Sequence, residues 1–94
     1  MLPIADALRL IKILAPYIPD ELDENVFDFA GKILDNIIGM GKHVDYLRAT
    51  YLMTGIDPDE LIKNSVEEVF GMFAQGLIDN EILTLLGFWQ ELRK

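Results

Sequence analysis

Apolar residues recur every three or four positions along most of the chain, and proline or glycine interrupts this pattern at short intervals. Such spacing places apolar side chains on one face of an α-helix, whereas a strand needs alternation of polar and apolar residues. No segment alternates in that way between turn signals. The sequence therefore predicts an all-α fold, a compact single domain of about five helices over residues 1–94.

Prolines and glycines fix the expected ends of the first two helices. Pro3 suits a first helical turn and Pro16 cannot continue a helix, so the first helix is predicted over residues 3–15. The second helix is predicted over residues 20–38, because the glycines in 39–41 supply the permissive backbone of a tight connection.

Three further helices are predicted in the second half of the chain. The third covers residues 42–53, followed by Gly55 as a C-terminal cap. Its expected inward face consists of Val44, Leu47 and Tyr51, with Leu52 as a further candidate. Asp57 and Pro58 form a helix-start signal, and the helix that they open is predicted to run to Gln75. The fifth helix places one apolar face inward: Ile82, Leu85, Leu86, Trp89 and Leu92.

The chain carries 8 basic and 16 acidic residues, a formal net charge of −8. Nucleic-acid binding gains affinity when Lys and Arg displace counterions, and docking on anionic membranes needs a basic face. The charge balance therefore disfavours nucleic acids and membranes as partners. It suits solubility or a basic protein partner.

Residues that could carry catalysis or hold a metal are sparse. The chain has no cysteine and no signal-like N-terminal stretch, which predicts a cytoplasmic location. His43 is the only histidine, so it has no second ligand or nucleophile of the usual kind beside it. The acids of 20–24 and 57–60 lack the glycine that a calcium loop needs at its sixth position, and they suit helix starts. We expect no metal, no cofactor and no enzymatic activity.

The last third of the chain has more large apolar side chains than one helical face can bury. Those of the fifth helix are Ile82, Leu83, Leu85, Leu86, Phe88, Trp89 and Leu92. Some are therefore expected to be exposed and to bind a partner helix in a groove, or a second copy of the chain. Methionine in the preceding helix adds adaptable apolar surface. The predicted partner-binding residues are Leu83, Phe88, Trp89 and Met72.

Three segments carry a family resemblance: residues 7–19, residues 46–57 with Leu47 and Leu52-Met53-Thr54-Gly55-Ile56-Asp57-Pro58, and residues 76–80. Together with the size, acidity and helical pattern of the chain, they resemble the tail assembly chaperones encoded among bacteriophage tail genes. The resemblance implies a helper in the host cytoplasm that binds the long, helical, largely apolar tape-measure protein. Such a helper keeps its client soluble before the tail tube polymerises.

Two other non-enzymatic functions fit the same residues. A structural subunit of a homo-oligomeric ring or head-tail connector would use the apolar surplus for symmetric self-association. An acidic inhibitor would present its carboxylates to a basic enzyme or DNA-binding protein. We favour the assembly factor over the inhibitor, because the acidic clusters are predicted at helix starts and not in a surface line.

Overall fold

The computed structural model describes residues 2–22 and 24–93, in which helices form and no strand does. Five α-helices are 11 to 14 residues long: α1 (Ile4–Leu14), α2 (Val26–Gly39), α3 (His43–Thr54), α5 (Val66–Asp79) and α6 (Ile82–Arg93). The 3-10 turn η1 (Ala15–Tyr17) follows α1, and the one-turn helix α4 (Pro58–Leu61) precedes α5. The predicted all-α domain of about five helices is confirmed.

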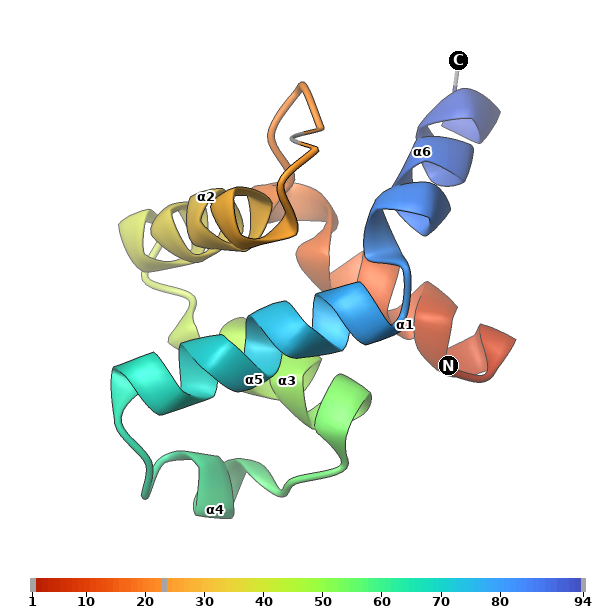
Figure 1. Cartoon of the computed structure of the whole chain (residues 1–94). Helices are drawn as coiled ribbons and strands as arrows, with labels where there is room; N and C mark the ends of the chain where they lie inside the picture. The colour runs from red at the N-terminus through yellow and green to blue at the C-terminus, as the bar shows by residue number, and fades with distance from the viewer. Residues whose placement is uncertain (1, 23, 94) are drawn as a thin grey trace.

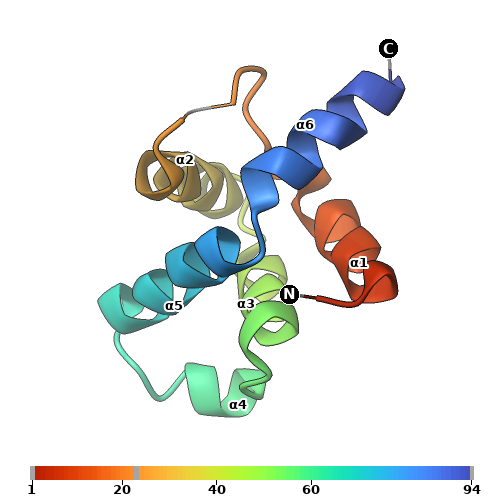
Figure 2. The ribbon, with the colours of Figure 1, turned by 45° about the vertical axis from the view of Figure 1, so that its right-hand side comes forward.

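Helix α3 lies behind α5 in Figure 1 and packs against α1, α2 and α5. Helix α6 packs against α5, and its C-terminal half extends away from the other helices in both ribbon views (Figures 1 and 2). A helix that projects in this way buries only its first turns, so its later apolar residues remain accessible.

The core draws on all five long helices. Its large, fully buried side chains are Leu10, Leu14, Phe29, Ile33, Ile37, Phe73, Leu77, Ile82 and Leu86. The ring of Tyr46 meets that of Phe73 edge to face, with ring centroids 5.1 Å apart. The buried hydroxyl of Thr50 donates a hydrogen bond to the carbonyl oxygen of Tyr46 at 2.9 Å. The ring contact joins α3 to α5, whereas the hydrogen bond lies within α3.

Helix α2 begins at Val26 and not at residue 20, so the predicted start is wrong. The Asn25 side chain caps the helix by accepting a hydrogen bond from the backbone N–H of Asp28 at 3.1 Å. Residues 18–22 and 24–25 contain no helix. The acids expected in a first helical turn thus precede the helix: Asp20, Glu21 and Glu24, with Asp23 outside the described residues.

The helix predicted to run from Asp57 to Gln75 is in fact two helices. Asp57 opens α4 as expected, by accepting a hydrogen bond from the Asp59 N–H at 2.9 Å. A second start signal then interrupts the run: Ser65 and Glu68 form a reciprocal capping box, at 3.1 and 3.3 Å. Helix α5 therefore begins anew at Val66 and continues to Asp79.

The inward face of α3 also differs from the prediction. Tyr46, Ala49 and Thr50 are buried, whereas Val44 and Tyr51 are exposed. Because α3 is packed between several helices, its small residues are the ones that allow close approach. The apolar periodicity of this helix is weak, so tertiary packing decides which face is buried.

Candidate partner-binding site

The four residues predicted to bind a partner do not form one surface. Phe88 is exposed, with 63% of its surface accessible, and it lies on α6 facing α1. Leu83 and Trp89 are half-buried and pack against the core. Met72 lines a separate shallow hollow with Met53 and residues of α5. Of the four, only Phe88 lines the groove described next.

An apolar groove lies between the N-terminal segment, α1 and α6, and we name it the α1/α6 groove. Its volume is about 410 Å³. It is lined by Leu2, Ile4, Ala7, Leu10, Asn80, Glu81, Ile82, Thr84, Leu85 and Phe88. Leu10 and Ile82 are fully buried and form its floor, whereas Ile4 and Phe88 are exposed at its edges. Apolar edges of this kind lose unfavourable contact with water when a partner covers them.

The corner between α5 and α6 builds one side of the α1/α6 groove. The backbone N–H of Leu2 donates a hydrogen bond to the side-chain oxygen of Asn80 at 2.9 Å, which ties the N-terminal segment to this corner. The amide nitrogen of Asn80 donates to the carbonyl of Gly76 at 2.8 Å. Glu81 has a positive φ of 49°, and the axes of α5 and α6 differ by 65°. The bend turns α6 toward α1.

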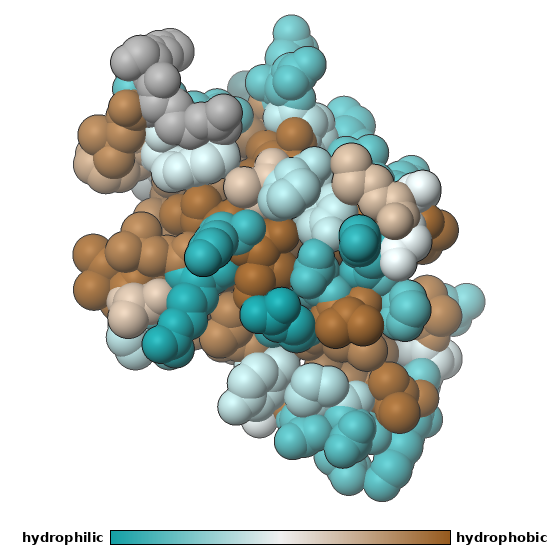
Figure 3. All heavy atoms as spheres, turned by 180° about the vertical axis from the view of Figure 1, so that it is seen from behind, coloured by the Kyte–Doolittle hydropathy of each residue, from teal (hydrophilic) through white to brown (hydrophobic). Residues whose placement is uncertain are grey.

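Other apolar side chains of α1 and α6 are exposed outside the lining of this groove. Leu8 on α1 and Leu92 on α6 are both exposed. Viewed from behind, a broad apolar area covers the side of the molecule that carries α1 and α6 (Figure 3). Contiguous apolar surface of this kind marks sites where proteins bind other proteins. The side of the molecule that carries α1 and α6 thus presents a large share of apolar surface, which polar side chains interrupt.

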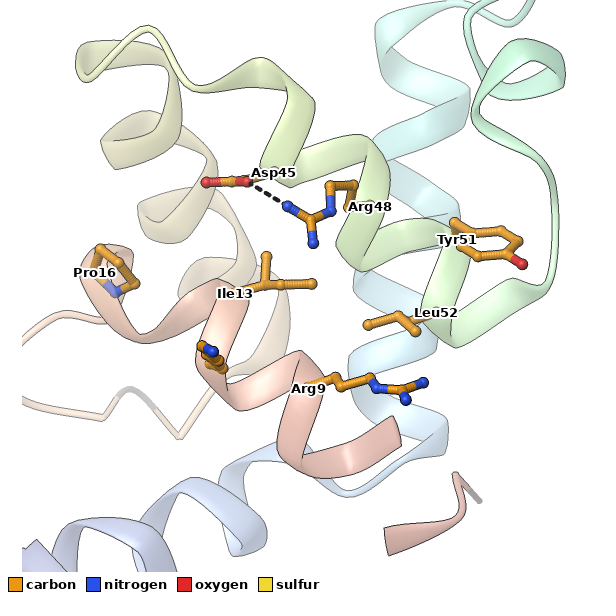
Figure 4. Close-up of a pocket in the computed structure, with 8 residues that line it drawn as sticks. Arg9, Ile13, Pro16, Asp45, Arg48, Tyr51 and Leu52 are labelled. Carbon is orange, nitrogen blue, oxygen red and sulfur yellow. Dashed lines mark ion pairs between the residues drawn. The ribbon is translucent and has the colours of Figure 1, made fainter. Parts of the chain in front are cut away.

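A second groove separates α1 from α3, and we name it the α1/α3 groove (Figure 4). It has a volume of about 510 Å³. Its lining differs in character from that of the first groove: Arg9, Lys12, Ile13, Pro16, Asp45, Arg48, Tyr51 and Leu52. Three of the 8 basic residues of the chain therefore line one groove.

Asp45 organises the polar side of the α1/α3 groove. One of its oxygens lies 3.7 Å from the guanidinium of Arg48, and the other accepts a hydrogen bond from the Tyr17 hydroxyl at 2.5 Å. That hydrogen bond, burial and the charge of Asp45 raise the pKa of Tyr17 to about 12. Arg9 on α1 pairs instead with Asp6 at 3.2 Å.

The structure shows where the histidine, the possible metal ligands and the most apolar helices lie. His43 is exposed at the first position of α3. Within residues 2–22 and 24–93, no three His, Asp or Glu side chains are grouped so as to hold a metal ion. No single helix in the described part is long and apolar enough to cross a membrane, although the bent pair α5 and α6 together reach that length and composition.

Comparisons with protein-family models, with curated proteins and with solved structures found no match. The grooves are therefore interpreted from their own geometry. Of the residues that the sequence singled out for binding, only Phe88 lines the apolar groove, and the contribution of Leu2 and Ile4 was missed. Sequence reasoning also missed the cationic groove, although Arg9 and Lys12 stand one helical turn apart and share a face.

Proposed function

We propose that this protein is a non-catalytic assembly factor that binds an apolar helix of another protein in the α1/α6 groove. The observation that carries the proposal is the groove itself, an open apolar channel between two helices with Ile4 and Phe88 exposed at its edges. Grooves between helices accept an amphipathic helix that lays its apolar side chains into them.

The negative charge of this chain suggests which polar residues the client helix carries. Glu81 lines the groove, and the chain as a whole carries a net charge of −8. A helix that flanks its apolar stripe with Lys or Arg would be attracted during approach, whereas an acidic helix would be repelled. The proposed client is therefore an apolar helix with basic flanks.

The resemblance to tail assembly chaperones agrees with a client of this kind. Under this proposal the client is a largely apolar, helical tape-measure protein, and the acidic surface of the present chain keeps the complex soluble before assembly. Masking an apolar stripe needs no catalytic group. The groove supplies the contact and the acidic exterior supplies solubility.

The exposed surface of Phe88 sets the change in binding affinity to expect. Full burial of a phenylalanine side chain stabilises by about 1.5 to 3 kcal/mol, and 63% of Phe88 is accessible in the free chain. Covering that fraction is therefore worth roughly 1 to 2 kcal/mol, or about 5- to 30-fold in affinity. A charge at this position should cost more, because a carboxylate would be desolvated in an apolar contact.

The test uses a designed amphipathic peptide with a leucine stripe and lysine flanks, labelled for fluorescence anisotropy. Phe88→Asp is expected to weaken binding at least about tenfold. Ile62→Asp is the matched control, because Ile62 is 65% exposed on the surface but does not line the α1/α6 groove. It introduces the same charge and should leave binding within about twofold.

Circular dichroism of both variants should retain the helicity of the parent chain, since neither residue is buried. Equal binding of the peptide by the parent chain and Phe88→Asp would refute the proposed site. Equal weakening by both substitutions would also refute it, because the loss would then not depend on the α1/α6 groove.

A further inference from the structure

We propose that the α1/α3 groove binds a second copy of this chain through the acidic residues Asp20, Glu21 and Glu24, which precede α2. This interaction is separate from the client groove and does not depend on it. It assigns a role to a groove lined by three cations and to three acids that helix capping does not explain.

The cations of the groove are available to a partner. Lys12 makes no ion pair with any described residue. Arg9 and Arg48 each pair with an acid one turn away on their own helix, and both side chains are largely exposed. Exposed pairs of this type contribute little to stability, so a partner carboxylate can join or replace them.

The contact with Asp45 orients the Arg48 side chain toward the α1/α3 groove. Asp45 contacts Arg48 through one oxygen while the Tyr17 hydroxyl occupies the other oxygen. Figure 4 shows the Arg48 side chain extending from α3 toward α1, above Ile13 and Leu52. Because its guanidinium has five donor hydrogens, one contact to Asp45 leaves others for an incoming carboxylate.

The acidic segment presents the complementary chemistry. Asp20, Glu21 and Glu24 are exposed and make no ion pair with any described residue. Leu22, which lies among them, packs against the core. The described residues of this loop stand out from the helices in both ribbon views (Figures 1 and 2). Its leucine anchors it, and its carboxylates remain in solvent.

Both surfaces carry closely spaced charges. Arg9 and Lys12, one turn apart on α1, have Cβ atoms about 5 to 6 Å apart. Asp20 and Glu21 lie in a bend and have Cα atoms about 3.8 Å apart. Neighbouring carboxylates can therefore face neighbouring cations.

A net charge of −8 opposes the approach of two copies, but salt limits this repulsion. At physiological ionic strength the Debye length is about 8 Å, so only charges close to the contact count. There, three carboxylates meet three cations, of which Arg9 and Arg48 also face Asp6 and Asp45 of their own chain. The contact should weaken as salt rises further, because salt then also screens the attraction between its carboxylates and its cations.

Sedimentation velocity on the full chain tests the proposal with two neutralised variants. The groove variant carries Arg9→Gln, Lys12→Gln and Arg48→Gln, and the segment variant carries Asp20→Asn, Glu21→Gln and Glu24→Gln. The parent chain should associate as concentration rises, whereas each variant alone should be monomeric. An equimolar mixture should form a one-to-one complex, because one variant keeps the acids and the other keeps the groove.

The matched control removes the same charge elsewhere, through Lys32→Gln, Lys42→Gln and Lys63→Gln, and it should associate as the parent does. A parent chain that stays monomeric would overturn the proposal. This holds even if a synthetic acidic peptide of residues 18–25 binds the groove, because the proposed partner is a second copy of the whole chain. A mixture that stays monomeric, a variant that still self-associates, or a control that is monomeric would also overturn it. So would association that persists unchanged in 1 M NaCl.

Discussion

Replacing Gly76 by alanine probes the closest approach between α3 and α5. A Cβ atom at this position would lie 2.9 Å from the Cβ of Met53, 3.0 Å from its sulfur and 3.2 Å from its methyl carbon. Carbon atoms pack best at about 3.5 to 4.0 Å. Rotation of the Met53 side chain can move its sulfur and methyl group, but its Cβ is fixed by the backbone. The two helices would therefore have to move apart.

The expected change in the free energy of unfolding is the sum of two opposing effects. Alanine gains about 1 kcal/mol over glycine inside a helix, and overpacking costs about 1 to 3 kcal/mol. Gly71 lies on the same helix with nothing within 4 Å of an added Cβ. Gly71→Ala should therefore raise the free energy of unfolding by about 1 kcal/mol, and Gly76→Ala should fall below it by about 1 to 3 kcal/mol.

Urea unfolding, followed by far-ultraviolet circular dichroism and by the fluorescence of the single tryptophan, measures both variants. The dependence of the free energy on urea should be the same for both, since each still unfolds the same surface. If Gly76→Ala proves as stable as Gly71→Ala, the close packing of α3 on α5 described above is wrong.

Alkaline stability and two tyrosine substitutions provide further tests. The pKa of Tyr17, raised by its hydrogen bond to Asp45 and by burial, and the pKa of Tyr46, raised by burial, are both about 12, against 10.0 ordinarily. The folded chain then holds more protons than the unfolded chain between pH 10 and 12, so the urea midpoint should be steady below pH 10 and fall across that window. Tyr46→Phe should stabilise by about 1 kcal/mol, because the Tyr46 hydroxyl is buried without a hydrogen-bond partner among the described residues. Tyr17→Phe should destabilise by roughly 1.5 to 3 kcal/mol through loss of a hydrogen bond to a carboxylate, and equal effects of the two substitutions would contradict this assignment.

Local chemistry decided the helix ends that the sequence predicted correctly. Pro16 ends α1, and Gly55 takes a left-handed conformation with φ of 76° after α3. Both effects depend on a single residue, so they can be identified without the fold. The start of α2 and the break before α5 depended on competing caps, Asn25 and Ser65, whose precedence over neighbouring signals is not evident from spacing alone.

The grooves were less predictable, because they join helices that are distant in sequence. The apolar surplus of α6 was visible, but Leu2 meets Asn80 across 78 positions of the chain. Likewise, Arg48 joins Arg9 and Lys12 only because α3 packs against α1. A one-dimensional pattern gives the faces of each helix, and it does not say which faces meet.

Mapping the amphipathic peptide on the isotopically labelled chain by NMR tests the central claim most directly. We predict that backbone amide shifts change within residues 2–10 and 80–88, which contain the lining of the α1/α6 groove, with α2 and α4 left unchanged. Shifts centred on α2, on α4 or on the hollow beside Met72 would contradict it.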